Sequence, residues 1–108
     1  MKFINLEPHV AVAGQIAPTD VPAIAAAGFR VLVNNRPDGE APGQPLSEDL
    51  EAVATAAGLE YHYLPVNAAN FPGPDTARLT DVFTEAARPV LAFCRTGTRC
   101  ANLWVVTR

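Results

Sequence analysis

The sequence has few of the residues that build metal centres and disulfide scaffolds. Among 108 residues there are two cysteines and two histidines. His9 and His62 lie far apart and lack the spacing of metal ligands, so we expect neither a metal nor an organic cofactor. Two cysteines suit a reducing compartment better than a disulfide framework.

Long apolar runs and basic clusters are also missing. No apolar run approaches the ~20 residues of a membrane-spanning helix, and residues 1–7 lack the apolar core of a secretory signal. The formal net charge is −3 and the basic residues are scattered along the chain, which disfavours nucleic acid as a partner. We therefore expect a cytoplasmic protein that binds neither membranes nor nucleic acid.

The sequence does contain a regular alternation of strand and helix patterns. Hydrophobic residues make up 49% of the chain, enough for the core of one compact domain over residues 1–108. Short apolar runs alternate with helical segments, which predicts an α/β fold: a three-layer arrangement with a mostly parallel sheet of four to five strands and helices on both faces. The expected strands are 3–6, 10–13, 29–34, 59–64 and 90–93, and the expected helices are 21–27, 48–57, 76–87 and a last one beginning by about 99.

Polar residues at the expected helix starts indicate side-chain caps. Thr19 or Asp20 would cap the first helix, Ser47 the second, and Asp75 or Thr76 the third, each by accepting a hydrogen bond from an unpaired backbone N–H.

One short stretch carries the chemistry of the chain. The strand 90–93 leads into Cys94–Arg99, which brings one thiol, two guanidiniums, two hydroxyls and one glycine together before a helix. A tight loop that opens a helix points its backbone N–H groups inward and binds anions. Such a setting also lowers the pKa of a thiol, so we expect Cys94 to be a nucleophile. A cysteine that only packs behind a turn is the alternative. The expected anion ligands are Arg95, Thr96, Gly97, Thr98 and Arg99.

Other polar residues follow neighbouring strands. Ligands of parallel sheets bind beyond the carboxyl ends of the strands, so Arg36, after strand 29–34, should come within reach of the cysteine loop, together with Asp38 or Glu40. Alternatively, Arg36 is a turn residue that pairs locally with Asp38 or Glu40.

Four segments resemble a known bacterial family. Gly14–Pro18, Ala27–Phe29, Asn35–Glu40 and Cys94–Arg99 are similar to the phosphatase-like domain of beta-lactamase hydrolase-like proteins. The resemblance implies the fold of dual-specificity and tyrosine phosphatases. The family has also been labelled a sulfur transferase family. Its members occur alone or fused to a persulfide dioxygenase-type domain, so the resemblance implies such a partner domain or protein. Similar domains continue with more helix after the cysteine loop, so the chain is either truncated at its C-terminus or covered there by another chain. Whether the protein forms a homo-oligomer is also left open by the sequence.

The resemblance points to two kinds of chemistry. Tyrosine phosphatases place five residues between their cysteine and arginine, whereas four separate Cys94 from Arg99, as in rhodanese-type sulfurtransferases. In dual-specificity phosphatases an acidic residue that protonates the leaving group follows the strand that 63–66 resembles. Here that place holds Asn67, which cannot donate such a proton. Asp75 is the nearest substitute, although a helix cap suits it better.

The short loop therefore favours sulfur transfer through a persulfide on Cys94, with Arg99 holding a small sulfur-containing anion. The alternative is a tyrosine or dual-specificity phosphatase that forms a cysteinyl-phosphate from a phosphate anion. A third interpretation is an anion- or partner-binding module without turnover. Cys100 stands where the phosphatase arginine would fall; it is either a small helical residue or a second thiol that resolves an oxidised Cys94.

Overall fold

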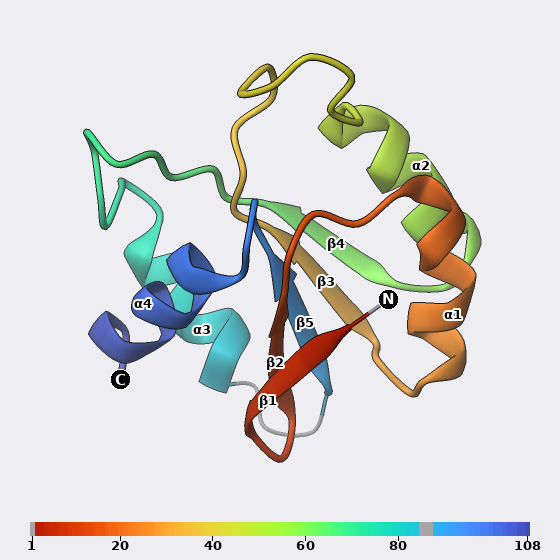
Figure 1. Ribbon diagram of the computed structural model, residues 1–108. Coiled ribbons are helices and arrows are strands. Elements are labelled where there is room, and N and C mark those ends of the chain that lie inside the picture. The colour runs from red at the N-terminus through yellow and green to blue at the C-terminus, as the bar shows by residue number, and fades with distance from the viewer. Residues whose placement is uncertain (1, 85–87) are drawn as a thin grey trace.

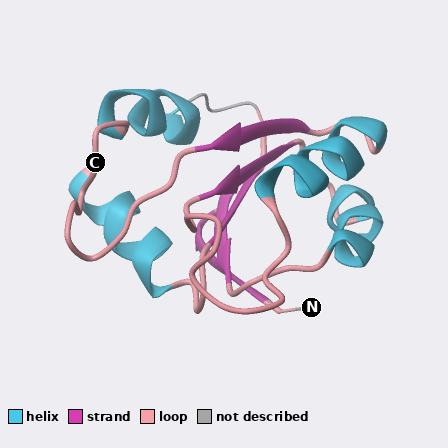
Figure 2. Ribbon diagram, turned by 90° about the horizontal axis from the view of Figure 1, so that it is seen from above, coloured by secondary structure: helices cyan, strands magenta, loops and turns pink. Residues whose placement is uncertain are grey.

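The computed structural model describes residues 2–84 and 88–108, in which a five-stranded sheet lies between two pairs of helices (Figures 1 and 2). The elements in chain order are β1 (Phe3–Glu7), β2 (Val10–Ala13), the 3-10 turn η1 (Pro18–Asp20), α1 (Val21–Ala26), β3 (Val31–Asn34), α2 (Ser47–Ala56), β4 (Glu60–Tyr63), α3 (Thr76–Thr84), β5 (Val90–Phe93) and α4 (Thr98–Val106).

The sheet confirms the predicted α/β class. Its strand order is β1-β2-β5-β3-β4. β5 pairs in parallel with β2 on one side and β3 on the other, and β4 extends the parallel part beside β3. Only the edge strand β1 runs antiparallel, in a hairpin with β2. The strand that leads to Cys94 is therefore the middle strand of the sheet.

Both faces of the sheet are covered, which explains why β2 and β5 are apolar at every position and β3 at all but its last residue, Asn34. Alternate residues of β5 point to opposite faces. Val90, Ala92 and Cys94 join the core beneath α3 and α4, whereas Leu91 and Phe93 join the core beneath α1 and α2. Cys94 thus shares its side of the sheet with the helix that begins just after it.

The predicted helix caps were wrong at two helices. The Asp20 carboxylate accepts a hydrogen bond from Ala17 N (2.8 Å) and so closes η1, but it does not cap α1. Ser47 lies inside α2, where its hydroxyl bonds the Tyr61 hydroxyl at 2.7 Å. Asp38, from the loop after β3, instead accepts the Ser47 N–H at 2.8 Å. At α2 a more distant segment of the chain therefore supplies a partner that the local sequence could not specify.

The ends of other elements also differ from the expectation. The strand expected over 29–34 begins at Val31. Phe29, which precedes it, packs its ring edge-on against Phe3 with centroids 5.1 Å apart. α3 ends at Thr84, and the remaining part of the expected helix, 85–87, lies outside the described residues. Across the described ranges, every helix is too short or too polar to cross a membrane.

Candidate active site

Cys94 lies at the junction of β5 and α4, as the sequence predicts. β5 ends at Phe93 and α4 begins at Thr98, so the connection is only Cys94 to Gly97. Gly97 has φ +91°, a conformation that glycine adopts at little cost. This turn directs the Gly97 N–H toward the Cys94 sulfur, to which it donates at 3.1 Å.

The pKa of the Cys94 thiol is lowered to about 5. The largest cause is a hydrogen bond from the Cys100 side chain. Burial opposes the shift, and the backbone N–H groups of Cys100, Thr96 and Gly97 add to it. Cys94 is therefore a thiolate at neutral pH, because opposing burial is outweighed by donors that favour the charged form. The sequence predicted this direction, but it assigned part of the cause to Arg95 and Arg99, which are not among the main contributors.

Cys100 is protonated where Cys94 is ionised. It is fully buried in the first turn of α4, and burial together with the neighbouring Cys94 raises its pKa well above the usual value. These opposite shifts fit a hydrogen bond in which the Cys100 thiol donates to the Cys94 thiolate. The sequence left open whether these two side chains meet, and the structure brings them together.

The end of β2 and the segment after it form backbone hydrogen bonds with the cysteine loop. Ala13 O accepts a hydrogen bond from Cys94 N at 3.3 Å, and Arg95 O accepts one from Gln15 N at 3.2 Å. A Cβ on Gly14 would lie 3.2 Å from Arg95 O, and one on Gly97 would lie 3.4 Å from the Ala13 carbonyl. The first distance is tighter than most Cβ contacts and the second is an ordinary one, so it is Gly14 that lets the two backbones approach this closely.

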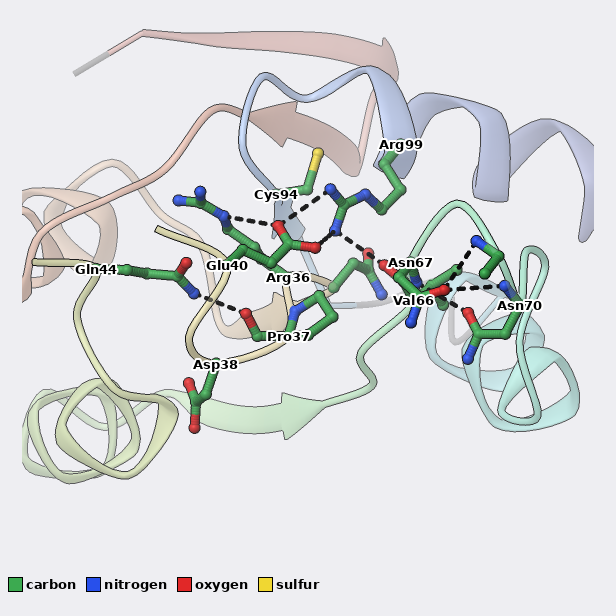
Figure 3. A network of polar contacts seen from close by, with 12 residues as sticks. Arg36, Pro37, Asp38, Glu40, Gln44, Val66, Asn67, Asn70, Cys94 and Arg99 are labelled. Atoms are coloured by element: carbon green, nitrogen blue, oxygen red, sulfur yellow. Dashed lines mark hydrogen bonds and ion pairs between the residues drawn. The ribbon is translucent and has the colours of Figure 1, made fainter. Parts of the chain in front are cut away.

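A carboxylate links two arginines beside the loop (Figure 3). Glu40 Oε1 accepts from Arg36 Nε at 3.0 Å, and Glu40 also accepts from Arg99 Nη1 and Nη2 at 3.1 and 3.2 Å. Arg99 Nη1 donates further to Val66 O (2.9 Å), and Arg36 Nη1 donates to Gln15 Oε1 (3.0 Å). Both alternatives considered for Arg36 thus hold, because it pairs locally with Glu40 and through it reaches the loop.

This network fixes the charge state of Glu40. Partial burial raises its pKa, but the hydrogen bonds from Arg99 and Arg36 outweigh burial and hold the pKa below its usual value. Glu40 is therefore ionised at neutral pH and cannot serve as a proton donor there.

A cavity of about 490 Å³ lies above Cys94. Six residues that the sequence nominated contribute to its walls, while Arg36 lines a neighbouring cavity of about 470 Å³. Gly97 and Cys100 are buried beneath the loop. The complete lining of the larger cavity is Asn67, Ala68, Phe71, Cys94, Arg95, Thr96, Thr98, Arg99 and Asn102.

The two candidates for a leaving-group acid occupy different places. Asn67 lines the cavity, but its Oδ1 accepts the N–H groups of Ala69 and Asn70 at 2.9 Å each and so builds a turn. Asp75 precedes α3, where its carbonyl accepts the Leu79 N–H at 2.9 Å, and it is not among the residues that line this cavity. No carboxyl or imidazole group belongs to the described cavity lining.

Sequence reasoning missed several residues of the site. Glu40 was expected either near the loop or as a local partner for Arg36, but not as the carboxylate that joins Arg36 to Arg99. Gln15 appeared only as a turn residue and part of a motif. Both follow the carboxyl ends of strands that flank β5, which is the signal that could have identified them. Phe71 and Asn102 carried no such signal, because the positions of the 67–74 loop and of one helix face depend on tertiary packing.

The fold and the loop place this protein in a structural class. A thiolate at the carboxyl end of the central strand, with backbone donors and the start of a helix around it, is the arrangement of a phosphatase-like α/β domain. Structures of Tk-PTP share the fold: a glycine-to-alanine mutant form of that protein is 20% identical, covers 97% of this chain and 69% of its own, and has a TM-score of 0.68. At that identity the likeness concerns the fold alone.

The chain belongs to the family described as beta-lactamase hydrolase-like protein, phosphatase-like domain, whose model matches residues 2–108. The beta-lactamase hydrolase-like protein of Agrobacterium fabrum is 37% identical over 98% of this chain, and that of Xylella fastidiosa is 31% identical over 99%. This chain spans about a quarter of the length of these relatives (25%). A candidate phosphatase of Neisseria meningitidis has 35% identity and a TM-score of 0.81, over 93% of this chain and 71% of its own.

Proposed function

We propose that the protein is a thiol-dependent phosphatase that acts on phosphate monoesters through a cysteinyl-phosphate on Cys94. The observation that carries this proposal is the Cys94 thiolate, with a pKa of about 5, at the floor of an anion-binding loop in a phosphatase-like domain. A nucleophile that is ionised at neutral pH needs no separate base to activate it. The name of the similar Neisseria protein agrees with this activity.

Two bond changes make up the reaction. In the first, the Cys94 sulfur attacks phosphorus and the bond from phosphorus to the leaving oxygen breaks, with the electron pair departing on that oxygen. In the second, water attacks the cysteinyl-phosphate, the S–P bond breaks, and phosphate and the thiolate are regenerated. The loop N–H groups and the Arg99 guanidinium would bind the phosphoryl oxygens as charge develops on them.

The composition of the cavity restricts the leaving group. Because no described wall residue can donate a proton at neutral pH, the departing oxygen must leave as an anion. Aryl phosphates release a phenolate, which is stable enough to do so, whereas alkyl phosphates release a strongly basic alkoxide. We therefore assign aryl phosphate monoesters as the preferred substrates.

The test compares p-nitrophenyl phosphate with phosphoserine. Wild-type protein should hydrolyse the aryl ester and leave phosphoserine essentially unchanged, and Cys94→Ser should lose the aryl activity because a hydroxyl lacks an adjacent base here. Asp75→Asn is the matched control and should retain full activity. Efficient hydrolysis of phosphoserine that depends on Asp75 would contradict the assignment and identify Asp75 as the acid.

Sulfur transfer is the second candidate, and two observations favour it. Only four residues separate Cys94 from Arg99, which makes a tighter ring than phosphatases of the tyrosine class use. In addition, the Cys100 thiol lies beside Cys94, where it can attack the inner sulfur of a Cys94 persulfide; the S–S bond to the outer sulfur breaks, hydrosulfide leaves, and a Cys94–Cys100 disulfide forms. In this reaction Cys94 attacks the outer sulfur of thiosulfate, the S–S bond breaks, and sulfite leaves with the electron pair. A thiol acceptor then takes the sulfur from the Cys94 persulfide.

Mass spectrometry separates the two candidates. Incubation with thiosulfate should add about 32 Da, the mass of one sulfur atom, if Cys94 accepts sulfur, and cyanide should remove it. Absence of this adduct together with turnover of the aryl ester would eliminate sulfur transfer. A stable adduct without any ester hydrolysis would reverse the order of the two candidates. If neither occurs while phosphate still binds, the domain is an anion-binding module.

A further inference from the structure

Two cavities meet at the arginines of the cysteine loop. The cavity above Cys94 has a volume of about 490 Å³, and the neighbouring one about 470 Å³. Arg95 and Arg99 line both of them. The other walls of the second cavity come from the loop after β3, namely Arg36, Glu40, Ala41 and Pro42.

The second cavity has an excess of positive charge. Its walls carry three guanidiniums and one carboxylate, and hydrogen bonds from Arg99 and Arg36 keep that carboxylate, Glu40, ionised. Since Glu40 offsets one positive charge, two remain, although the protein as a whole carries −3. A local charge opposite in sign to the net charge concentrates anions at that place.

Donor groups remain available for such an anion. Arg36 uses Nε for Glu40 and Nη1 for Gln15, while Arg99 uses its two terminal nitrogens for Glu40 and Val66. This leaves Nη2 of Arg36 and Nε of Arg99 without a protein acceptor among the described residues. Arg95 is exposed, and it likewise has no acceptor within residues 2–84 and 88–108. Guanidinium donors held in this way suit a planar carboxylate or a second phosphate oxygen.

We propose that the cavity of Arg36, Glu40, Ala41 and Pro42 is a second anion subsite, which selects substrates carrying a further anionic group beyond the one that Cys94 attacks. The chemical class is a bifunctional anion, with a phosphoryl group at Cys94 and a carboxylate or second phosphate at the subsite. Arg36, whose side chain is only 7% exposed, forms the back of this subsite, and Arg95 and Arg99 bridge the two cavities. The proposal rests on the proposed function, since it uses the Cys94 loop as the first anion site.

Direct binding of unreactive phosphonates tests the proposal without requiring turnover. The ligands are alkylphosphonates with three to six carbons, each paired with the ω-phosphonocarboxylate of equal length, so that a terminal methyl is compared with a terminal carboxylate. Calorimetry at low ionic strength should show an affinity about fivefold higher for the carboxylate at the length that spans the two cavities. A pair of ligands too short to span them should show little difference.

A charge introduced at the rim of the subsite provides the matched variants. Pro42 is exposed in the loop after β3 and makes no hydrogen bond to the cysteine loop. Pro42→Glu should abolish the preference for the carboxylate, so that the affinity ratio falls to about 1, whereas Pro42→Gln should keep the preference. Both variants remove the proline, but only Pro42→Glu adds a negative charge. The preference is the ratio of the two affinities within one variant, so any general effect of the substitution on anion binding at the shared Arg95 and Arg99 divides out.

The outcomes distinguish failure of the second subsite from failure of the proposed function. Equal affinity for methyl- and carboxylate-ended ligands at every length would overturn the subsite, while binding of the alkylphosphonates would still support the anion loop. A preference that survives Pro42→Glu undiminished would also overturn it, because the carboxylate would then bind elsewhere. Failure of every phosphonate to bind at millimolar concentration would contradict both proposals.

Discussion

At the scale of single residues, the site depends on two neighbouring cysteines that have opposite protonation states. Cys94 is ionised because donors surround its sulfur, and Cys100 stays protonated because it is buried beside that charge. Because Cys100 stays protonated, its thiol can always donate a hydrogen bond, and this bond stabilises the charge on Cys94. The position that holds Cys100 therefore contributes to the acidity of the nucleophile, in addition to filling the first turn of α4.

Replacing Cys100 tests how much its thiol contributes to the low pKa of Cys94. Cys100→Ala removes the largest contribution to the low pKa of Cys94 and should raise that pKa by about 1–2 units, because a hydrogen bond to a charged group is worth about 1.5–3 kcal/mol. Cys100→Ser keeps a donor and should leave the pKa close to wild type. The measurement is the rate of iodoacetamide alkylation against pH.

The sign of the pH dependence follows from the direction of the shift. Alkylation requires the thiolate, so the wild-type rate should rise through about pH 5 and be level near pH 7. In Cys100→Ala the rise should occur at higher pH. Profiles that match wild type in both the alanine and the serine variant would show that the backbone N–H groups alone hold the charge. Wild-type alkylation can be followed at Cys94 alone below pH 9, because the pKa of the buried Cys100 is raised.

At the scale of elements, the strand–loop–helix unit β5–α4 was the part best predicted from the sequence. The apolar run before Cys94, the glycine and the polar loop together fix a local geometry that needs little tertiary information. The cap of α2 was predicted wrongly for the opposite reason. Asp38 reaches the Ser47 N–H from nine residues away, a partner that only the path of the intervening loop can supply.

The backbone turn at Gly97 directs its N–H group toward the Cys94 sulfur. Gly97→Ala should destabilise the fold by about 1–2 kcal/mol, because φ +91° is unfavourable for alanine. The strained turn should also move the Gly97 N–H away from Cys94 and slow alkylation at pH 6. Urea unfolding and alkylation rates measure the two effects.

Gly58, just after α2, provides the comparison for Gly97. It has φ +83°, and a Cβ added there would meet nothing within 4 Å. Gly58→Ala should therefore lower the free energy of unfolding by a similar ~1 kcal/mol from backbone strain alone, while alkylation of Cys94 stays unchanged. Equal alkylation rates in the two alanine variants would argue against a role for the Gly97 N–H at the thiolate.

At the scale of the whole molecule, the sequence predicted the class of fold and the edge of the sheet that carries the site. It did not predict the strand order, because register and neighbours depend on how the two apolar faces are shared among four helices. That order matters for function. It places the ends of β2 and β3 on either side of β5, so Gln15, Arg36 and Glu40 all surround Cys94 and Arg99.

The same arrangement sets the electric field that an approaching anion meets. The protein carries −3 overall, which repels anions at long range, whereas Arg36, Arg95 and Arg99 attract them near the site. The range of each effect depends on salt, since the screening length is ~30 Å at 0.01 M and ~3 Å at 1 M. The response of an anionic reagent to salt therefore reports which field governs its capture.

Two alkylating reagents that differ in charge make this measurable. The ratio of Cys94 alkylation rates for iodoacetate over neutral iodoacetamide should be highest at 0.01 M salt and fall several-fold by 1 M, because salt screens attraction by the arginines. Iodoacetamide corrects for changes in thiolate content and accessibility. Arg95→Gln should lower the ratio at low salt and flatten its salt dependence, since the exposed Arg95 lies at the entrance of both cavities. A ratio that rises with salt would mean that the net negative charge, and not the arginine cluster, controls the approach of anions to Cys94.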